Sequence, residues 1–170
     1  MKKLSIVTAI AVLISMHTIT AQEGFSAKVG LNSVSVKTDL GAIGTGSVSN
    51  SEIGFYAGAG YNFSVNDSFS IEPAALVSIV SDLTSLYVPI MVQYKISDGF
   101  FAQGGPQLNY LLEDVPDGAL GIDLAIGAGY NFDENWYVEA KYGFEVARGG
   151  DFGEFTSINT LSIGTGYRFN

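Results

Sequence analysis

The stretch that decides the fold is residues 53–63, which reads IGFYAGAGYNF. Its odd-numbered residues are all apolar or aromatic, whereas the even-numbered positions hold three glycines, one asparagine and one tyrosine. Successive side chains of a β-strand point to opposite faces of the sheet, so a period of two predicts a strand and not a helix. The stretch therefore predicts a strand with one apolar face.

The same alternation recurs along most of the chain. It is clear in residues 69–79, 86–96, 120–132, 136–146 and 161–169, and weaker in 25–31 and 100–112. The clearer segments have the roughly 9 to 11 residues that a tilted transmembrane strand requires. A repeat supports the total of eight strands, because GAGYNF at 58–63 returns at 127–132, which is four predicted strands later.

The connections between these segments alternate in length. Short turn sequences stand at 66–67, 97–99 and 133–135, whereas 37–51, 113–119 and 148–155 are longer and polar; 81–82 is a short exception. Short turns on one side and longer loops on the other are typical of outer-membrane barrels. The sequence therefore predicts an all-β fold, an eight-stranded antiparallel up-and-down transmembrane β-barrel.

The aromatic residues indicate which face of the barrel meets lipid. Many of them lie on the apolar faces within a few residues of the short turns, where an interfacial girdle of a membrane barrel is expected. A soluble ligand-binding barrel, the alternative, would spread its aromatic residues along the strands. The predicted girdle consists of Tyr61, Phe63, Phe69, Tyr94, Tyr130, Phe132, Trp136, Tyr167 and Phe169.

Charged residues occupy the opposite face, which would line the lumen. An eight-stranded barrel has an interior that side chains fill, and charges buried there must be paired or hydrogen-bonded. We expect a polar network of mixed sign near the short turns, with a structural role and not that of a proton or ion pathway. Its predicted members are Lys28, Glu72, Lys95, Glu139, Lys141 and Arg168.

The N-terminus has the pattern of a secretory signal peptide. Lys2 and Lys3 precede an apolar run from Leu4 to Ile14, which is shorter than the roughly 20 residues of a transmembrane helix. We expect cleavage near Ala21, so that residues 1–21 form the signal and 22–170 the barrel domain. Export and the predicted fold together indicate the outer membrane.

Composition excludes several classes of function for the mature chain. The predicted cleavage removes Lys2, Lys3 and the single histidine, and the sequence has no cysteine. Serine triads, thiolate metal sites and most zinc sites are then unavailable, so we expect no enzyme, no cofactor and no metal site. The mature chain has 6 Lys and Arg against 17 Asp and Glu, a formal charge of 6 − 17 = −11, which argues against nucleic acid as a partner.

Several segments together resemble the PorT-like outer-membrane β-barrel proteins of Bacteroidetes. They are Val88-Pro89-Ile90 with Gln93-Tyr94-Lys95, the stretch 99–110, the stretch 127–132 and the ending 163–169. The resemblance covers nearly the whole mature chain. It implies an outer-membrane barrel inserted by the barrel-assembly machinery. It says little about activity, since the members of the family are mostly uncharacterised; the founding member assists protein secretion.

The sequence leaves three functions open. The first is a non-enzymatic barrel, a monomer in contact with outer-membrane lipid and lipopolysaccharide, that serves envelope structure or contacts something outside through acidic loops. The second is a narrow channel or a subunit of a secretion or uptake complex, and the third is the soluble ligand-binding barrel. The residues of the acidic loops are Asp39, Glu52, Asp82, Glu113, Asp114, Asp117, Asp151 and Glu154.

Overall fold

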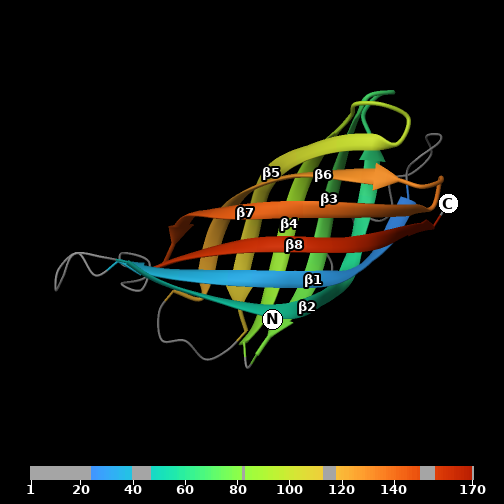
Figure 1. Cartoon of the computed structure of the whole chain (residues 1–170). Coiled ribbons are helices and arrows are strands. Elements are labelled where there is room, and N and C mark those ends of the chain that lie inside the picture. Colours follow the sequence, from blue (N-terminus) through green and yellow to red (C-terminus); the bar gives the residue numbers. More distant parts are fainter. Residues whose placement is uncertain (1–23, 40–46, 82, 113–117, 150–155, 170) are drawn as a thin grey trace, which may run out of the picture.

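Eight strands form one closed antiparallel barrel in the computed structural model, which describes residues 24–39, 47–81, 83–112, 118–149 and 156–169 (Figure 1). Each strand pairs with its neighbours in the chain, and β8 closes the barrel by pairing with β1. The predicted fold class is confirmed. The strands are β1 (Gly24–Asp39), β2 (Ser47–Ser64), β3 (Phe69–Val80), β4 (Leu83–Lys95), β5 (Phe100–Leu111), β6 (Leu120–Asn131), β7 (Trp136–Arg148) and β8 (Thr156–Phe169).

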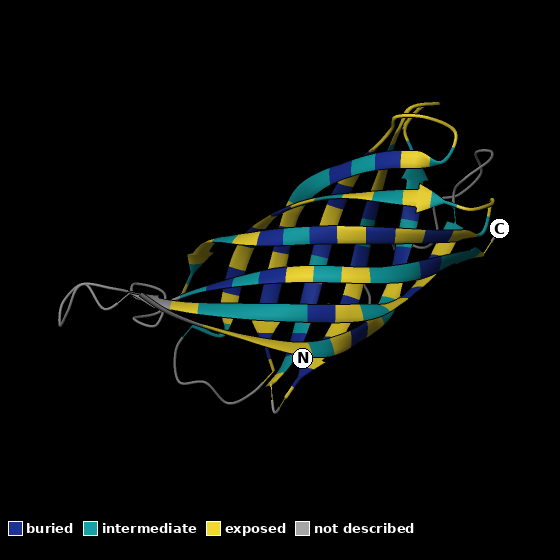
Figure 2. Cartoon of the chain, viewed as in Figure 1, coloured by how far each residue is buried: buried dark blue, intermediate teal, exposed yellow. Residues whose placement is uncertain are grey.

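Exposure alternates along the strands as the sequence pattern requires (Figure 2). Large apolar side chains point outward; Ile53, for example, is 72% exposed and Leu124 is 52% exposed. The inward positions are mostly polar or small, so the barrel is apolar outside and polar inside, the arrangement of a transmembrane barrel. No helix among the described residues is long and apolar enough to cross a membrane.

Three tight connections mark one end of the barrel, here called the turn rim: residues 65–68, 96–99 and 132–135. The Asn66 side-chain oxygen accepts hydrogen bonds from the amides of Ser68 (2.9 Å) and Phe69 (3.0 Å). Asp133 does the same for Asn135 (2.8 Å) and Trp136 (2.6 Å). Side chains of Asn and Asp stabilise turns in this way, which explains why these sequences reverse the chain so sharply.

The opposite end, the loop rim, differs from the sequence prediction. Residues 37–39 and 47–51 of the loop expected across 37–51 are strand, because β1 and β2 pair continuously from Gly24↔Asn62 to Asp39↔Ser47. The pairing of β8 with β1 extends equally far, to Thr38↔Thr156, whereas β3 reaches β2 only as far as Phe55↔Ile79. Three strands thus extend beyond the rest of the barrel (Figure 1), and we call this region the projecting sheet.

The alternation in the projecting sheet is present in the sequence but concealed. Val34 and Val36 alternate with serines, and a segment rich in serine and asparagine has the composition of a loop. Pairing overrides that local preference: β1 is bonded by β2 and β8 on its two sides, and residues 47–53 of β2 are bonded by β1 on one side. Of the loops expected at 37–51, 113–119 and 148–155, residues 40–46, 113–117 and 150–155 lie outside the described residues, as does Asp82.

Two tyrosines occupy the space that inward-facing glycines leave free. A Cβ atom on Gly166 would lie 2.2 Å from the Tyr137 ring, and one on Gly164 would lie 2.3 Å from the Tyr56 hydroxyl oxygen. Tyr137 is fully buried and Tyr56 is 3% exposed. The missing side chains on β8 therefore let large rings from β7 and β2 fill the lumen against its wall.

Replacing Gly166 with alanine is expected to lower the free energy of unfolding by about 1–3 kcal/mol, because the added methyl group overlaps the Tyr137 ring. The measurement is urea unfolding of the refolded barrel in lipid vesicles, followed by the fluorescence of Trp136. Gly104→Ala is the matched control, since its Cβ would meet nothing nearer than 3.6 Å. Equal urea midpoints for the two variants would show that the packing of the Tyr137 ring does not require a glycine at position 166.

Candidate functional site in the polar lumen

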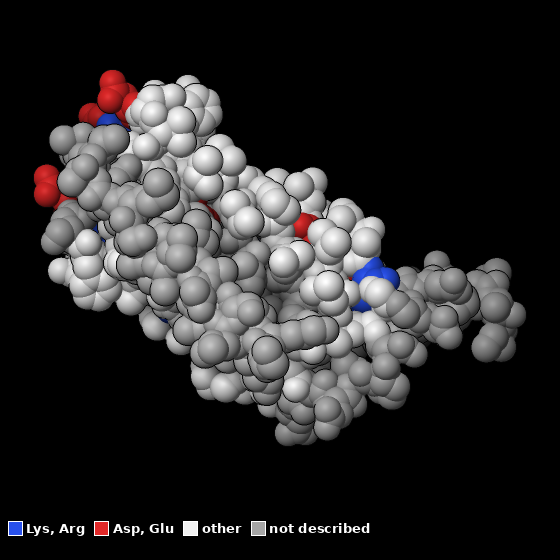
Figure 3. All heavy atoms as spheres, turned by 180° about the vertical axis from the view of Figure 1, so that it is seen from behind, with Lys and Arg blue, Asp and Glu red and all other residues white. Residues whose placement is uncertain are grey.

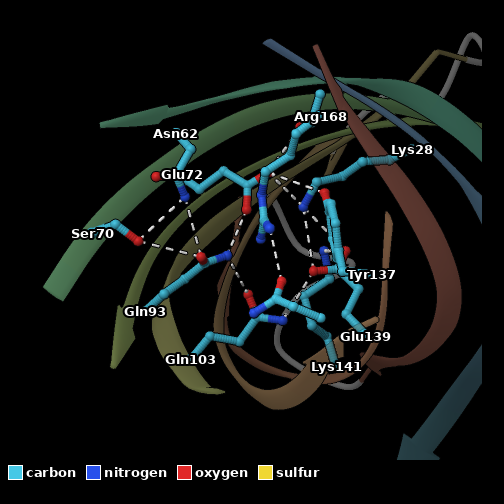
Figure 4. Close-up of polar contacts among 12 residues, drawn as sticks. Lys28, Asn62, Ser70, Glu72, Gln93, Gln103, Tyr137, Glu139, Lys141 and Arg168 are labelled. Carbon is cyan, nitrogen blue, oxygen red and sulfur yellow. Dashed lines mark hydrogen bonds and ion pairs between the residues drawn. The ribbon is translucent and has the colours of Figure 1, made fainter. Parts of the chain in front are cut away.

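Four charged side chains meet in the lumen, towards the turn rim (Figure 4). Lys28 of β1 lies with its Nζ atom 2.8 Å from Glu72 Oε1 of β3 and 3.2 Å from Glu139 Oε1 of β7. Lys141, also on β7, lies with its Nζ atom 3.0 Å from Glu139 Oε1. None of the four side chains is more than 4% exposed. We call them the four-charge cluster, and its formal charges cancel.

Amide and hydroxyl groups complete the hydrogen bonds of the two carboxylates. Gln93 donates to Glu72 Oε2 at 2.5 Å, and Ser26 donates to Glu72 Oε1 at 3.0 Å. Gln103 donates to Glu139 Oε2 at 3.1 Å. A buried ion pair is tolerated when its remaining lone pairs are satisfied. The arrangement therefore holds the strands β1, β3, β4, β5 and β7 together from the inside.

Arg168 lies beside this cluster, nearer the turn rim. Its guanidinium donates to Asn131 Oδ1 at 2.7 Å and lies 4.3 Å from the centroid of the Tyr137 ring. The Tyr137 hydroxyl donates to Glu72 Oε1 at 3.4 Å. Arg168 therefore contacts the cluster through a ring and not through a carboxylate.

Lys95 does not belong to the cluster, which corrects the sequence prediction. Its Nζ atom lies 3.3 Å from Asp98 Oδ1, and its side chain is 45% exposed. The reason is its position as the last residue of β4, where the next residues turn and an inward side chain reaches water at the rim. Gln93, two residues earlier on the same face, takes the place beside Glu72.

Two further layers of side chains fill the lumen between the four-charge cluster and the loop rim; here 'above' means nearer the loop rim. Above Glu72, an apolar layer of Tyr56, Ala74, Leu76 and Tyr87 fills the lumen. Above it, Asn32 donates to Ser78 at 3.0 Å and accepts from Ser162 at 3.0 Å. The predicted lumen network did not include Asn32, Ser78 or Ser162, although their position on the inward faces of their strands was a usable signal.

A charged pair lies near the loop rim. Arg148 Nε donates to Glu145 Oε1 at 2.6 Å, and Arg148 Nη1 donates to the Gly118 carbonyl at 2.7 Å. Neither residue is a member of the predicted polar network. A β-bulge in the pairing of β6 and β7 lies close to the pair, and a shift of one residue reverses which side chains face inward.

The space left in this interior is small. A cavity of about 60 Å³ opens at the turn rim and is lined mainly by polar side chains, including Asn62, Ser70 and Gln93, which is room for a few water molecules. Within the described ranges no three His, Cys, Asp or Glu residues are grouped so that they could hold a metal ion. The site is a packed polar plug.

The predicted girdle residues lie on the outer surface beside the turn rim, in contact with one another. The ring centroids are 4.9 Å apart for Phe69 and Tyr94, and 5.0 Å apart for Trp136 and Tyr167. Figure 3 shows one face of the barrel, whose described atoms are mostly uncharged along its length with charged side chains towards the ends. The remaining contacts join Tyr61 with Phe63, Tyr130 with Phe132 and Tyr167 with Phe169.

Fold and lumen define the class of the protein: a small transmembrane β-barrel with a packed polar interior. The chain belongs to the family of the outer membrane protein beta-barrel domain, whose model matches residues 6–169. Family membership places it in the outer membrane. Comparison with curated proteins gives no match.

Solved structures with the same fold share little sequence with this chain. Ail, the attachment invasion locus protein of Yersinia pestis, is 17% identical at a TM-score of 0.54, with 86% of this chain and 99% of that chain covered. Neisserial surface protein A is 14% identical at a TM-score of 0.58, with 86% and 97% covered. A de novo designed transmembrane barrel is 15% identical at a TM-score of 0.54, with 89% and 100% covered. These likenesses concern the fold.

Glu139→Gln is expected to lower the free energy of unfolding by about 3–5 kcal/mol, because Lys28 and Lys141 then share a single carboxylate in a buried site. The measurement is urea unfolding in vesicles at constant pH and salt.

Adding Lys141→Met to this variant removes one charge of the opposite sign and is expected to restore part of the loss. Asp98→Asn, which breaks the exposed pair with Lys95, serves as the control and should unfold like the parent protein. A Glu139→Gln barrel as stable as the parent would contradict a stabilising role of the cluster.

Proposed function

We propose that this protein is a closed, non-enzymatic outer-membrane barrel that serves envelope structure or a contact at the cell surface. The observation that carries the proposal is the filled lumen. The four-charge cluster, the apolar layer with Tyr56 and Tyr87, and the Glu145–Arg148 pair obstruct it at three successive levels. A barrel without an open path contributes through its wall, its rims and its loops.

The projecting sheet supports a role at the surface. It carries β1 and β2 past the end of β3, and its edge along residues 47–53 has no β3 partner. Within it, Glu52 accepts a hydrogen bond from Ser81, which braces the sheet against the turn between β3 and β4. A braced extension beyond the membrane is a platform for loops, and loops are where binding residues are concentrated.

The acidic loops limit the class of surface partner. Of the predicted loop acids, Glu52 is described and exposed, and Asp39 lies at the end of β1. The others lie outside the described residues. Ail has been crystallised with the heparin analogue sucrose octasulfate. The negative charge of this chain argues against a soluble sulfated glycan of that kind as the partner of its loops, since like charges repel.

The remaining parts of the proposal concern origin, biogenesis and partners. The resemblance to PorT-like proteins supports a place among the Bacteroidetes barrels, with cleavage of residues 1–21 during export and insertion by the barrel-assembly machinery. The partners we propose are outer-membrane lipid and lipopolysaccharide, with the barrel as a monomer and without nucleic acid. The absence of histidine after residue 17 supports the non-enzymatic assignment.

The second candidate is a narrow channel or a subunit of a transport complex, and conductance separates it from a closed barrel. We expect the refolded protein to run faster on gels before boiling than after, and to show no steady conductance in planar bilayers. The matched control is Tyr56→Ala combined with Leu76→Ala, which removes most of the apolar layer. Steady conductance of the parent protein, at a level that the control does not exceed, would favour the channel.

Orientation is tested by single cysteines, for which the chain is well suited because it contains none of its own. Ser51→Cys lies on the exposed projecting sheet and Asp67→Cys on the exposed turn rim. On intact cells we expect a membrane-impermeant maleimide to label the first variant and to reach the second only after the outer membrane is permeabilised. The reverse labelling would place the projecting sheet in the periplasm and remove the support for a surface role.

A further inference from the structure

Asn109 and Asp123, deep in the lumen, have polar atoms without a hydrogen-bond partner among the described residues. Asn109 of β5 is 0% exposed and Asp123 of β6 is 1% exposed. Asp123 Oδ2 accepts a hydrogen bond from Gln107 at 2.8 Å, but its Oδ1 atom has no partner in the part of the chain that the structure describes. Both amide atoms of Asn109 also lack one there. Each buried polar group left in this state costs about 1–3 kcal/mol, so the groups require an explanation.

The strand register brings these atoms to one place. Gln107 pairs with Asp123, and Asn109 pairs with Gly121, so Asn109 and Asp123 are diagonal neighbours on the inward face. The Cα atoms of diagonal neighbours are about 7–8 Å apart, a separation that one small ion between the side chains can bridge.

A third oxygen comes from the opposite direction. A Cβ on Gly143 of β7 would lie 2.7 Å from Thr160 Oγ1 and 3.5 Å from Asp123 Oδ2, which places the hydroxyl of β8 and the carboxylate of β6 around the same glycine. The hydroxyl of Thr160 and the carboxylate of Asp123 therefore lie around Gly143, Asn109 is the diagonal neighbour of Asp123, and all three residues are buried.

The charges around this pocket do not balance. Glu145 is bonded to Arg148 Nε at 2.6 Å and to the amide of Ile158 at 2.6 Å, so this pair is already matched. Lys28 and Lys141 are matched by Glu72 and Glu139 in the four-charge cluster. The other inward cation among the described residues, Arg168, lies at the turn rim. Lys141 lies two residues from Gly143, about 7 Å along the strand, but its Nζ atom lies 3.0 Å from Glu139 Oε1.

Asp123 lies opposite Glu145 in the pairing of β6 and β7, and the two carboxylates have one cation near them, Arg148, so this layer keeps an excess of one negative charge among the described residues. Burial of an isolated ion costs several kcal/mol even after relaxation. A water molecule would satisfy the hydrogen bonds of Asn109 and Asp123, but it would leave the charge unmatched. A cation bound between the two side chains answers both requirements.

We propose that Asp123, Asn109 and Thr160, in the part of the lumen nearer the loop rim, form a binding site for one monovalent cation of the sodium or potassium class. Calcium prefers six to eight oxygen ligands with several carboxylates, and only one free carboxylate faces this pocket among the described residues. The cation ties β5, β6 and β8 together on the side of the apolar layer opposite the four-charge cluster. This site is independent of whether the barrel acts at the surface or as a channel.

The test is unfolding of the full refolded barrel in sodium, potassium or choline chloride at equal ionic strength. Choline is too large for the pocket and supplies the same screening. Above the dissociation constant, each tenfold rise in sodium or potassium should raise the folding equilibrium constant tenfold, as a single site requires. Equal stability in all three salts would overturn the proposal and assign the pocket to water or to a protonated Asp123.

Asp123→Asn is expected to abolish the salt preference, whereas the control Asp98→Asn, on the exposed turn, should retain it. Retention of the preference by Asp123→Asn would place the cation elsewhere. A second measurement does not depend on a variant: crystals of the parent protein soaked in thallium or rubidium salts should show an anomalous peak within bonding distance of Asp123 Oδ1. A soaked crystal without that peak would overturn the proposal.

Discussion

The structure depends on the need of every backbone amide and carbonyl group for a partner inside the lipid. A strand edge in hydrocarbon would leave a row of such groups unbonded, each at a cost of several kcal/mol, so a sheet can cross the membrane only as a closed barrel. The pairing of β8 with β1, from Phe25↔Phe169 to Thr38↔Thr156, provides that closure. The outward apolar face and the aromatic contacts beside the turn rim suit a lipid environment.

Closure with eight strands also determines the interior. The enclosed space is too narrow for a water column, so side chains must fill it, and the polar ones must find partners among themselves. Lys28, Glu72, Glu139 and Lys141 do so as a neutral cluster surrounded by amides. Glycines on β8 admit the rings of Tyr56 and Tyr137. The same side chains therefore stabilise the barrel, through packing and charge pairing, and obstruct its lumen.

The two ends of the barrel differ in a way that bears on function. At the turn rim, Asn66 and Asp133 fix short turns that leave little surface for recognition. At the loop rim, three strands continue past their neighbours and carry the chain outward. Since the lumen is packed between these ends, an interaction at the surface acts through the projecting sheet and its loops, while the wall and the lumen supply a rigid support.

The sequence by itself determined the period of the strands, their number, the face that meets lipid and the residue types of the lumen, because these follow from local alternation and from turn chemistry. It did not determine which lumen residues meet. Lys95 and Gln93 share a face of β4, and only the position of the turn decides that Gln93 contacts Glu72 while Lys95 reaches water. The length of β1 and β2, the partner of Arg148 and the unpartnered carboxylate oxygen of Asp123 likewise depend on how the strands are aligned when the barrel closes, and this alignment is a property of the tertiary structure.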